Sequence, residues 1–213
     1  MTPELLASLC LFAIVTSITP GPNNALLFAS GVNFGIRRTL PHLLGVTLGF
    51  TFMQLAIGLG VGMVFEAVPG LYSTLRALGV AYMLYLAWRI ANSTPPATAE
   101  SGIDAVPATT ARPMTFFEAS AFQWVNPKAV MMCVTAASTY APPDQPVMGP
   151  LIVAGVFFVA GMPCVGLWVL LGRVMRGLLQ DRRRLLAFNW SMAVLLVASM
   201  GPMARDILND GLF

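Results

Sequence analysis

Long runs without a charged residue alternate with short polar segments along this chain. Four runs contain no Asp, Glu, Lys or Arg, namely residues 5–36, 39–65, 145–172 and 185–204. Two further apolar runs, 71–91 and 116–139, carry isolated charges. Because about 20 apolar residues cross a bilayer as a helix, the pattern predicts six spanning helices, at 4–30, 42–64, 71–91, 116–139, 148–172 and 185–204.

Helix-breaking sequences interrupt the first and the fourth of these predicted helices. They are Thr19-Pro20-Gly21-Pro22-Asn23-Asn24 and Asn126-Pro127-Lys128. Backbone broken at membrane depth is tolerated only where protein or a watery cavity satisfies its polar groups. In secondary transporters, broken helices at matching places in two halves indicate the substrate site. We therefore expect Asn23, Asn24, Asn126 and Lys128 to surround a central cavity.

Composition assigns the whole chain to the membrane. The 213 residues are 57% hydrophobic and 10% charged, with a mean hydropathy of +0.76, whereas soluble domains carry about 25% charged residues. We therefore expect a single transmembrane domain over residues 1–213. The net charge of +3 resides mainly in short loops, which indicates orientation in a bilayer rather than nucleic-acid binding.

The loop charges also predict the topology. Arginines follow the first and fifth helices and flank the segment after the third, whereas Glu66 and Asp144 occupy loops without Lys or Arg. Basic loops stay in the cytoplasm, so both termini are expected outside the cell. A polar linker at about 92–115 separates two halves of three helices, about 1–91 and 116–213. An odd number of helices per half makes the second an inverted repeat of the first.

The first helix break offers polar groups to a ligand. Pro20 and Pro22 lack an N–H and clash with the preceding turn, so the helix should restart with free amides beside Asn23 and Asn24. Such a helix N-terminus favours an anionic group, for example a carboxylate. The alternative is a packed kink that binds nothing.

Lys128 lies at the centre of the fourth predicted helix, where a charge is costly and usually functional. It is expected to bind a substrate carboxylate or to carry a proton in a coupled cycle, since buried lysines change their pKa readily. The alternative is a structural one, in which Lys128 caps the carbonyls of a broken helix.

Other ionisable residues suggest no cofactor or catalytic site. His42, the single histidine, is expected at the membrane interface, and one imidazole is too few ligands for a metal. Glu118 is expected to pair with a neighbour such as Arg112. Hydrolytic chemistry needs a base beside a nucleophile, which the sequence does not offer, so we expect neither an enzyme nor a bound cofactor.

The motifs resemble those of the LysE-type family of amino-acid exporters over nearly the whole chain. The segment from Ser17 to Asn23 is similar to the first family signature, and that from Phe116 to Ala129 to the second. Residues 78–86 resemble the third-helix pattern. The loop 37–42 and the start of the last helix depart from the family pattern, which leaves the particular substrate open.

The resemblance implies a six-helix exporter of an amino acid or its derivative in the bacterial inner membrane. It further implies drive by proton motive force and pairing as a homodimer. By motif match, the substrate path would include Thr19, Pro20, Gly21, Pro22, Asn23, Asn24, Asn126, Pro127 and Lys128. The alternative is a transporter of another small polar metabolite or of an ion, although acidic or soft ion ligands are almost absent from the spans.

Overall fold

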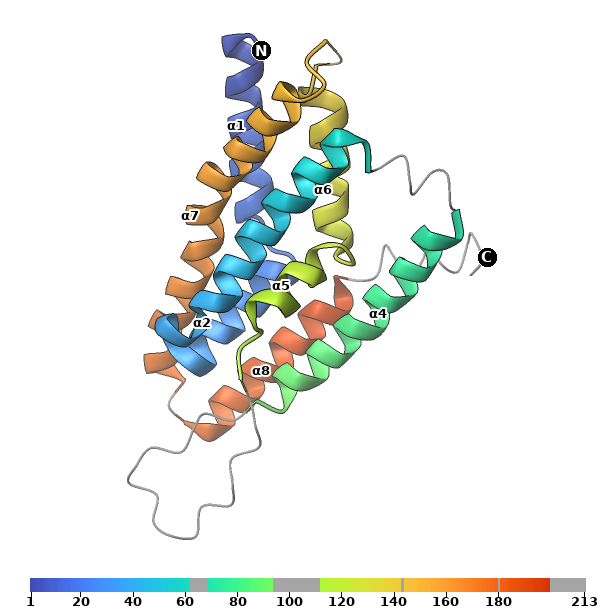
Figure 1. Cartoon of the computed structure of the whole chain (residues 1–213). Coiled ribbons are helices and arrows are strands. Elements are labelled where there is room, and N and C mark those ends of the chain that lie inside the picture. The colour runs from blue at the N-terminus through green and yellow to red at the C-terminus, as the bar shows by residue number, and fades with distance from the viewer. Residues whose placement is uncertain (62–68, 94–111, 143, 180, 200–213) are drawn as a thin grey trace.

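The computed structural model describes all residues except 62–68, 94–111, 143, 180 and 200–213. The described residues form seven α-helices and one short π-helical segment, with no strand among them (Figure 1). The α-helices are α1 (Pro3–Ile18), α2 (Pro22–Ala56), α4 (Pro69–Ala91), α5 (Phe116–Gln123), α6 (Pro127–Tyr140), α7 (Met148–Leu178) and α8 (Arg182–Ala198). The π-helical segment η1 (Ile57–Val61) continues α2.

Both predicted helix breaks are present. The first separates α1 from α2, and the second separates α5 from α6. Each new helix begins with proline, Pro22 or Pro127, at its first position. Proline suits that position because the missing N–H would have no partner in the helix and its fixed φ is already helical. The first and fourth predicted helices are therefore each divided in two.

The boundary between the first and second predicted helices differs from the expectation. The chain reverses at Gly35, whose φ of 73° lies in the left-handed region, and helical backbone resumes at once. Glycine reaches this conformation without the Cβ clash that other residues suffer. Residues 36–41 are consequently helical rather than a loop, and the second helix begins six residues before the predicted position 42.

The remaining bounds follow the hydrophobic pattern closely. The expected third helix (71–91) is α4, and the fifth (148–172) is α7, which extends to Leu178. The sixth (185–204) is α8, which begins at Arg182 and is described to Ala198. Glu66 and residues 94–111 of the expected linker lie outside the described residues, so those two expectations stay predictions.

Glycines bring α2 close to two other helices. Gly31 of α2 faces Gly172 of α7, and a Cβ on either would collide with backbone atoms of the other helix. Gly45 and Gly49 face α5 in the same way, and the Ser120 hydroxyl donates to the Gly45 carbonyl over 3.1 Å. The small-residue face of α2 thus packs within the chain. α2 contacts α7 most extensively, and α4 packs against α8.

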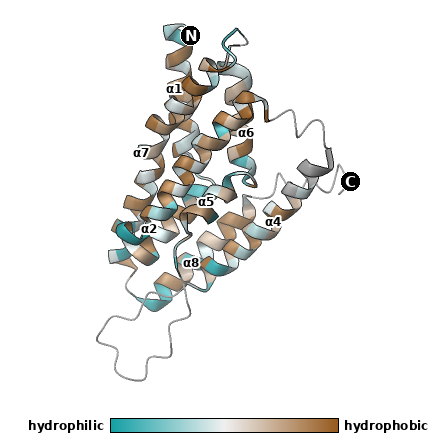
Figure 2. Ribbon diagram, viewed as in Figure 1, coloured by the Kyte–Doolittle hydropathy of each residue, from teal (hydrophilic) through white to brown (hydrophobic). Residues whose placement is uncertain are grey.

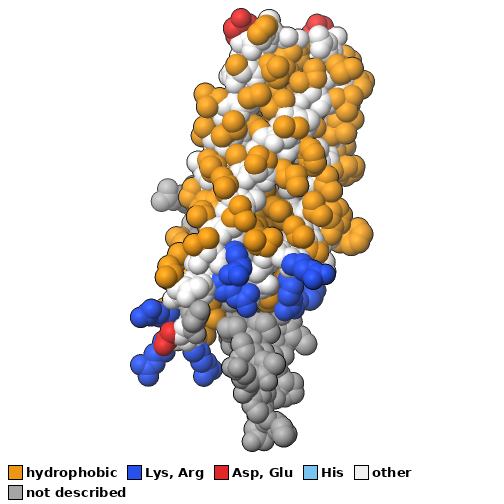
Figure 3. Space-filling view, turned by 90° about the vertical axis from the view of Figure 1, so that its left-hand side faces the viewer, with side chains coloured by type: hydrophobic (Ala, Val, Ile, Leu, Met, Phe, Trp, Pro, Cys, Tyr) orange, Lys and Arg blue, Asp and Glu red, His pale blue; other side chains and the backbone are white. Residues whose placement is uncertain are grey.

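The outside of the bundle is apolar along its length (Figures 2 and 3). Large side chains are exposed there, including Phe52 at 65%, Phe117 at 79% and Val159 at 72%. Arginines gather at one end (Figure 3), where Arg176 lies beside the Gly35 reversal. An apolar belt with a basic end is the surface expected of a membrane protein.

Two stretches are each long and apolar enough to cross a membrane, Pro22–Val61 and Met148–Leu178. Pro3–Ile18 and Ala77–Ala91 are shorter apolar helices. The breaks leave pieces such as α1, with 16 residues, and α5, with 8. Of the pieces created by the two breaks, α1, α5 and α6 are each too short to cross a bilayer alone.

Candidate substrate-binding cavity

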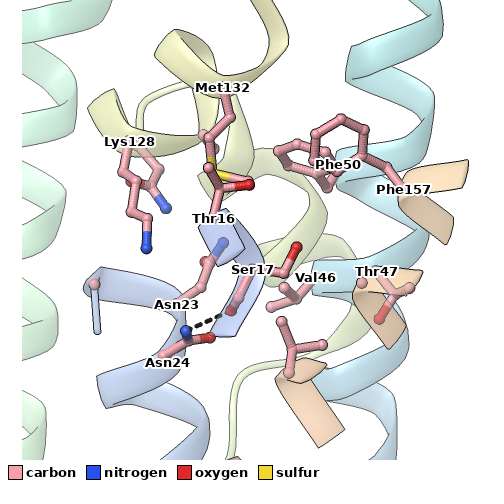
Figure 4. Close-up of a pocket in the computed structure, with 15 residues that line it drawn as sticks. Thr16, Ser17, Asn23, Asn24, Val46, Thr47, Phe50, Lys128, Met132 and Phe157 are labelled. Atoms are coloured by element: carbon pink, nitrogen blue, oxygen red, sulfur yellow. Dashed lines mark hydrogen bonds between the residues drawn. The ribbon is translucent and has the colours of Figure 1, made fainter. Parts of the chain in front are cut away.

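A cavity lies between the two helix breaks (Figure 4). About 50 Å³ of it is open to the centres of water molecules, which is room for a few waters or part of a small solute. Residues of α1, α2, α6 and α7, together with both break segments, form its wall. They are Thr16, Ser17, Gly21, Asn23, Asn24, Val46, Thr47, Phe50, Asn126, Lys128, Ala129, Met132, Phe157, Gly161 and Val165.

The structure brings five of the nine motif residues to this cavity, which are Gly21, Asn23, Asn24, Asn126 and Lys128. The other four, Thr19, Pro20, Pro22 and Pro127, do not line it. The prolines begin or precede the new helices, and Thr19 follows the end of α1. These four residues shape the breaks, while the five others face the enclosed space.

The carbonyl groups freed at the end of α1 have partners. The Asn24 amide donates to the carbonyl of Ser17 at 2.8 Å and to that of Thr19 at 2.7 Å. The Trp168 indole N–H donates to the carbonyl of Ile18 at 3.2 Å. Because unpaired backbone groups are costly at membrane depth, these side chains make the interruption of the helix tolerable.

Lys128 completes this arrangement from the second half of the chain. Its Nζ donates to the Thr19 carbonyl at 2.8 Å, the Thr19 hydroxyl at 2.9 Å and the Pro20 carbonyl at 3.3 Å. An ammonium group has three hydrogens, so all three are engaged. Gly21 leaves room for the Lys128 chain, since a Cβ there would lie 2.7 Å from its Cδ. Of the roles considered for Lys128, capping the broken helix is the one the contacts display.

The two restarted helices begin without side-chain caps. Neither Gly21, at the start of α2, nor Asn126, at the start of α6, makes a side-chain capping hydrogen bond. By contrast, Thr115 caps α5 and Asp181 caps α8. Both uncapped N-termini border the same cavity. Their partial positive charges and free amides suit an anionic group.

Amide side chains join the two breaks. The Asn23 amide donates to Gln123 Oε1 at 2.7 Å, and the Gln123 amide donates back to Asn23 Oδ1 at 3.2 Å. Asn126 is only 1% exposed, lines the cavity, and its Oδ1 accepts no hydrogen bond. A buried acceptor without a partner is costly, so this oxygen is available to a donor inside the cavity.

Several wall residues escaped the sequence analysis. Val46, Thr47 and Phe50 come from the second part of α2, and Phe157, Gly161 and Val165 recur every four residues on α7. That spacing marks one helix face, but an apolar helix does not reveal which face turns inward. Gln123 offered a better signal, because it is a polar residue three positions before Asn126 in an apolar run.

The structure corrects the expectation for His42 and confirms the expected pairing of Glu118 with Arg112. His42 is 1% exposed rather than interfacial, because α2 already begins its second part at residue 36 and carries His42 into the bundle. Among the described residues, no group of His, Cys, Asp and Glu side chains is suited to hold a metal ion. Arg112 pairs with Glu118 through two 2.6 Å hydrogen bonds, as predicted. This carboxylate raises the pKa of the Arg112 guanidinium.

An apolar helical bundle with two interrupted helices around a polar cavity is the architecture of a membrane transporter. The chain belongs to the LysE type translocator family, whose model matches residues 14–200. It is therefore a membrane translocator and not an enzyme.

Similar proteins match over nearly the full length. The chain is 33% identical to the cysteine/O-acetylserine efflux proteins of Escherichia coli (strain K12) and Shigella sonnei (strain Ss046). Each alignment spans 202 residues, which are 92% of this chain and 96% of the relative. No solved structure shows a significant match to the chain.

Proposed function

We propose that this protein exports small neutral amino acids, of the size of cysteine and O-acetylserine, across the bacterial inner membrane. The full-length similarity to proteins named for efflux of those two compounds supports the substrate class. The cavity supports it independently, because its polar groups complement both charges of an amino-acid zwitterion.

The substrate carboxylate would lie at the uncapped N-termini of α2 and α6. The substrate ammonium would donate to Asn126 Oδ1, the buried acceptor without a partner. This unsatisfied oxygen beside two uncapped helix starts is the observation that carries the proposal. The positive charge of Lys128 at the same wall adds attraction for the carboxylate while its hydrogens cap α1.

The apolar part of the wall would receive the substrate side chain. Phe50 and Phe157 line the cavity on the side away from Lys128 and Asn24, and Met132 lines it one turn beyond Lys128 on α6 (Figure 4). Methionine and aromatic side chains form adaptable apolar surface. A short side chain carrying a thiol or an acetyl ester fits such a wall, whereas a long charged one would find no partner among these three residues.

Two inverted repeats would form the two halves that move against each other in the transport cycle. In each half, a helix broken just before a proline is followed by two further helices. The third helices of the two halves, α4 and α8, pack together. The second helices also meet, because Phe50 in the second part of α2 lies 5.2 Å from Phe157 of α7 between ring centres. Such like-with-like contacts are expected around a pseudo-twofold axis between six spans. Rocking of one half against the other would expose the cavity alternately to each side.

Coupling to protons and pairing into homodimers remain predictions that rest on the family resemblance. Transport of another small polar metabolite or of an ion is the alternative function. The described residues contain no cluster of metal-binding side chains, and the two uncapped helix N-termini favour an anionic group over a cation.

Efflux in everted membrane vesicles tests the proposal. Vesicles with the protein should accumulate labelled O-acetyl-L-serine and L-cysteine when a proton gradient is applied, and an uncoupler should stop accumulation. Asn126→Leu should reduce uptake about tenfold or more, since a hydrogen bond to a charged group contributes about 1.5–3 kcal/mol. Asn92→Leu is the matched control, because Asn92 is exposed directly after α4 and its side chain, among the described residues, bonds to the Trp88 carbonyl.

Two results would contradict the proposal. If the parent protein accumulates neither compound nor any other amino acid, it is not an amino-acid exporter. If Asn126→Leu transports as well as Asn92→Leu at equal amounts of inserted protein, the cavity between the breaks is not the substrate site. Accumulation that persists with the uncoupler would exclude proton coupling and would leave the proposed export of amino acids intact.

A further inference from the structure

A second cavity lies at the arginine-rich end of the bundle, and about 40 Å³ of it is open to the centres of water molecules. It shares no lining residue with the cavity between the breaks. Its polar wall residues are Ser30, Asn33, His42, Arg89, Ser93 and Arg112. The first part of α2 lines both cavities. Asn23 and Asn24 line the cavity between the breaks, and Ser30 and Asn33 line the second one.

Most polar groups of this wall are already paired. The Ser30 and Thr39 hydroxyls form a 2.9 Å hydrogen bond. The Asn33 amide donates to Asn189 Oδ1 at 3.0 Å, and Asn189 in turn donates to the Ser93 carbonyl at 2.7 Å. These bonds tie α2 to α8 and to the end of α4, so the wall is built by fixed contacts.

His42 is the exception. Its side chain lines the cavity and is only 1% exposed. Neither Nδ1 nor Nε2 has a hydrogen-bond partner. A neutral imidazole carries one donor and one acceptor. Leaving both unpaired in a protein interior is costly, which indicates that a bound polar molecule pairs with the ring nitrogen nearer the cavity.

Arg89 supplies a positive charge at the same cavity, and no acidic side chain among the described residues pairs with it. Its guanidinium donates to the Arg112 carbonyl at 2.8 Å and lies 5.7 Å from the centre of the Tyr85 ring. The ion pair formed by the described residues joins Arg112 to Glu118 instead. Because Glu118 neutralises Arg112, the net charge that the described wall residues place at this cavity is that of Arg89.

We propose that this cavity is a second amino-acid site, in which Arg89 binds the carboxylate and one imidazole nitrogen of His42 accepts from the ammonium. The occupant's class rests on the proposed export of amino acids. An α-amino acid carries an acceptor and a donor on neighbouring atoms, which suits a guanidinium and an imidazole nitrogen that line the same cavity. At the arginine-rich end, expected in the cytoplasm, the site would hold substrate before it reaches the cavity between the breaks.

The single histidine makes the site directly observable. The full-length protein is labelled with ¹⁵N-histidine, purified through a tag without histidine, and placed in phosphatidylcholine nanodiscs. Titration with O-acetyl-L-serine should move the imidazole nitrogen signals saturably. The methyl ester of O-acetyl-L-serine, which lacks the carboxylate charge, should require at least about tenfold higher concentration.

Variants then assign the response. Arg89→Gln should raise the half-saturating concentration about tenfold, whereas Arg183→Gln, an exposed arginine of α8, should leave it unchanged. Asn126→Leu should reduce efflux about tenfold or more but keep the histidine response, which separates this site from the cavity between the breaks.

Three outcomes would overturn the second site. One is an unmoved histidine signal in a parent protein that still exports O-acetyl-L-serine, a result that leaves the proposed function intact. Another is loss of the response in Asn126→Leu, which would assign it to the cavity between the breaks. The last is a shift caused by phosphatidylglycerol in the nanodisc without any amino acid, which would make the occupant a lipid phosphate.

Discussion

Single side chains decide whether a broken helix can exist inside this bundle. Lys128 and Asn24 come from different halves of the chain, yet both donate to the carbonyl of Thr19. The same Lys128 also places its charge at the wall of the cavity. Structural and substrate-binding roles therefore coincide at one residue, and they are separable only by measuring stability and transport on the same samples.

Lys128→Met should lower both the stability of the protein and its transport activity. The variant leaves the carbonyls of Thr19 and Pro20 without the ammonium donor, and losing hydrogen bonds to a charged group should reduce the free energy of unfolding by about 1.5–3 kcal/mol. Thermal unfolding in detergent measures this loss. Efflux per folded molecule should also fall, because the cavity loses its positive charge.

Thr19→Val is the comparison for Lys128→Met. It removes one acceptor of Lys128 but keeps the charge, so stability should fall less and efflux per folded molecule should persist. Normal efflux per folded Lys128→Met molecule would limit Lys128 to its capping role.

At the level of elements, the two breaks create a pair of helix starts that a continuous helix would lack. α2 and α6 each begin with a proline after a break, and neither N-terminus has a side-chain cap. Continuous helices through these points would pair the same amides with the preceding turn. The anion-binding potential of the cavity therefore depends on the interruption itself and not only on the side chains around it.

Replacing Pro20, Gly21 and Pro22 together by Ala should rebuild one continuous helix from α1 into α2. Alanine has the highest helix propensity, so the protein should still insert, while efflux should be lost with the free N-terminus of α2. Pro41→Ala is the control, since Pro41 is an exposed proline inside α2 and away from both breaks. Membrane-inserted protein and efflux are measured together, and full efflux of the triple variant would reduce the first break to a packing kink.

The whole molecule combines an apolar belt with a basic end (Figure 3). α1 begins at the end opposite the arginines, and α7 leads into the arginines that open α8 (Figure 1). Positive charge beside a span is retained in the cytoplasm. The basic end thus predicts the orientation of the bundle, with the second cavity expected on the cytoplasmic side.

Reporter fusions test this orientation. Fusions after residues 100 and 178 should report the cytoplasm, and a fusion at the C-terminus should report the periplasm, because six spans return the chain to its starting side. An alkaline phosphatase and a fluorescent protein reporter, active on opposite sides, give complementary readouts. A cytoplasmic C-terminus would refute both the six spans and the inverted repeat.

The sequence by itself determined the helical class, the helix breaks and the pair of motifs that meet at one cavity. These features are local, because proline removes an N–H wherever it stands and long apolar runs favour lipid over water. His42 and Phe157 illustrate the opposite case, since nothing next to them in the chain reveals what they face in the bundle.

Only the tertiary structure decided which contacts the polar groups make. Lys128 and Thr19 are 109 positions apart in the chain. That Lys128 caps the end of α1 is therefore visible only in the packed structure. The chain reverses at Gly35 where a loop was expected, and helix resumes at residue 36. His42 consequently lies in the interior and not at the interface. Burial and hydrogen bonding depend on neighbours from other helices, and in a uniformly apolar chain the hydrophobic pattern does not specify those neighbours.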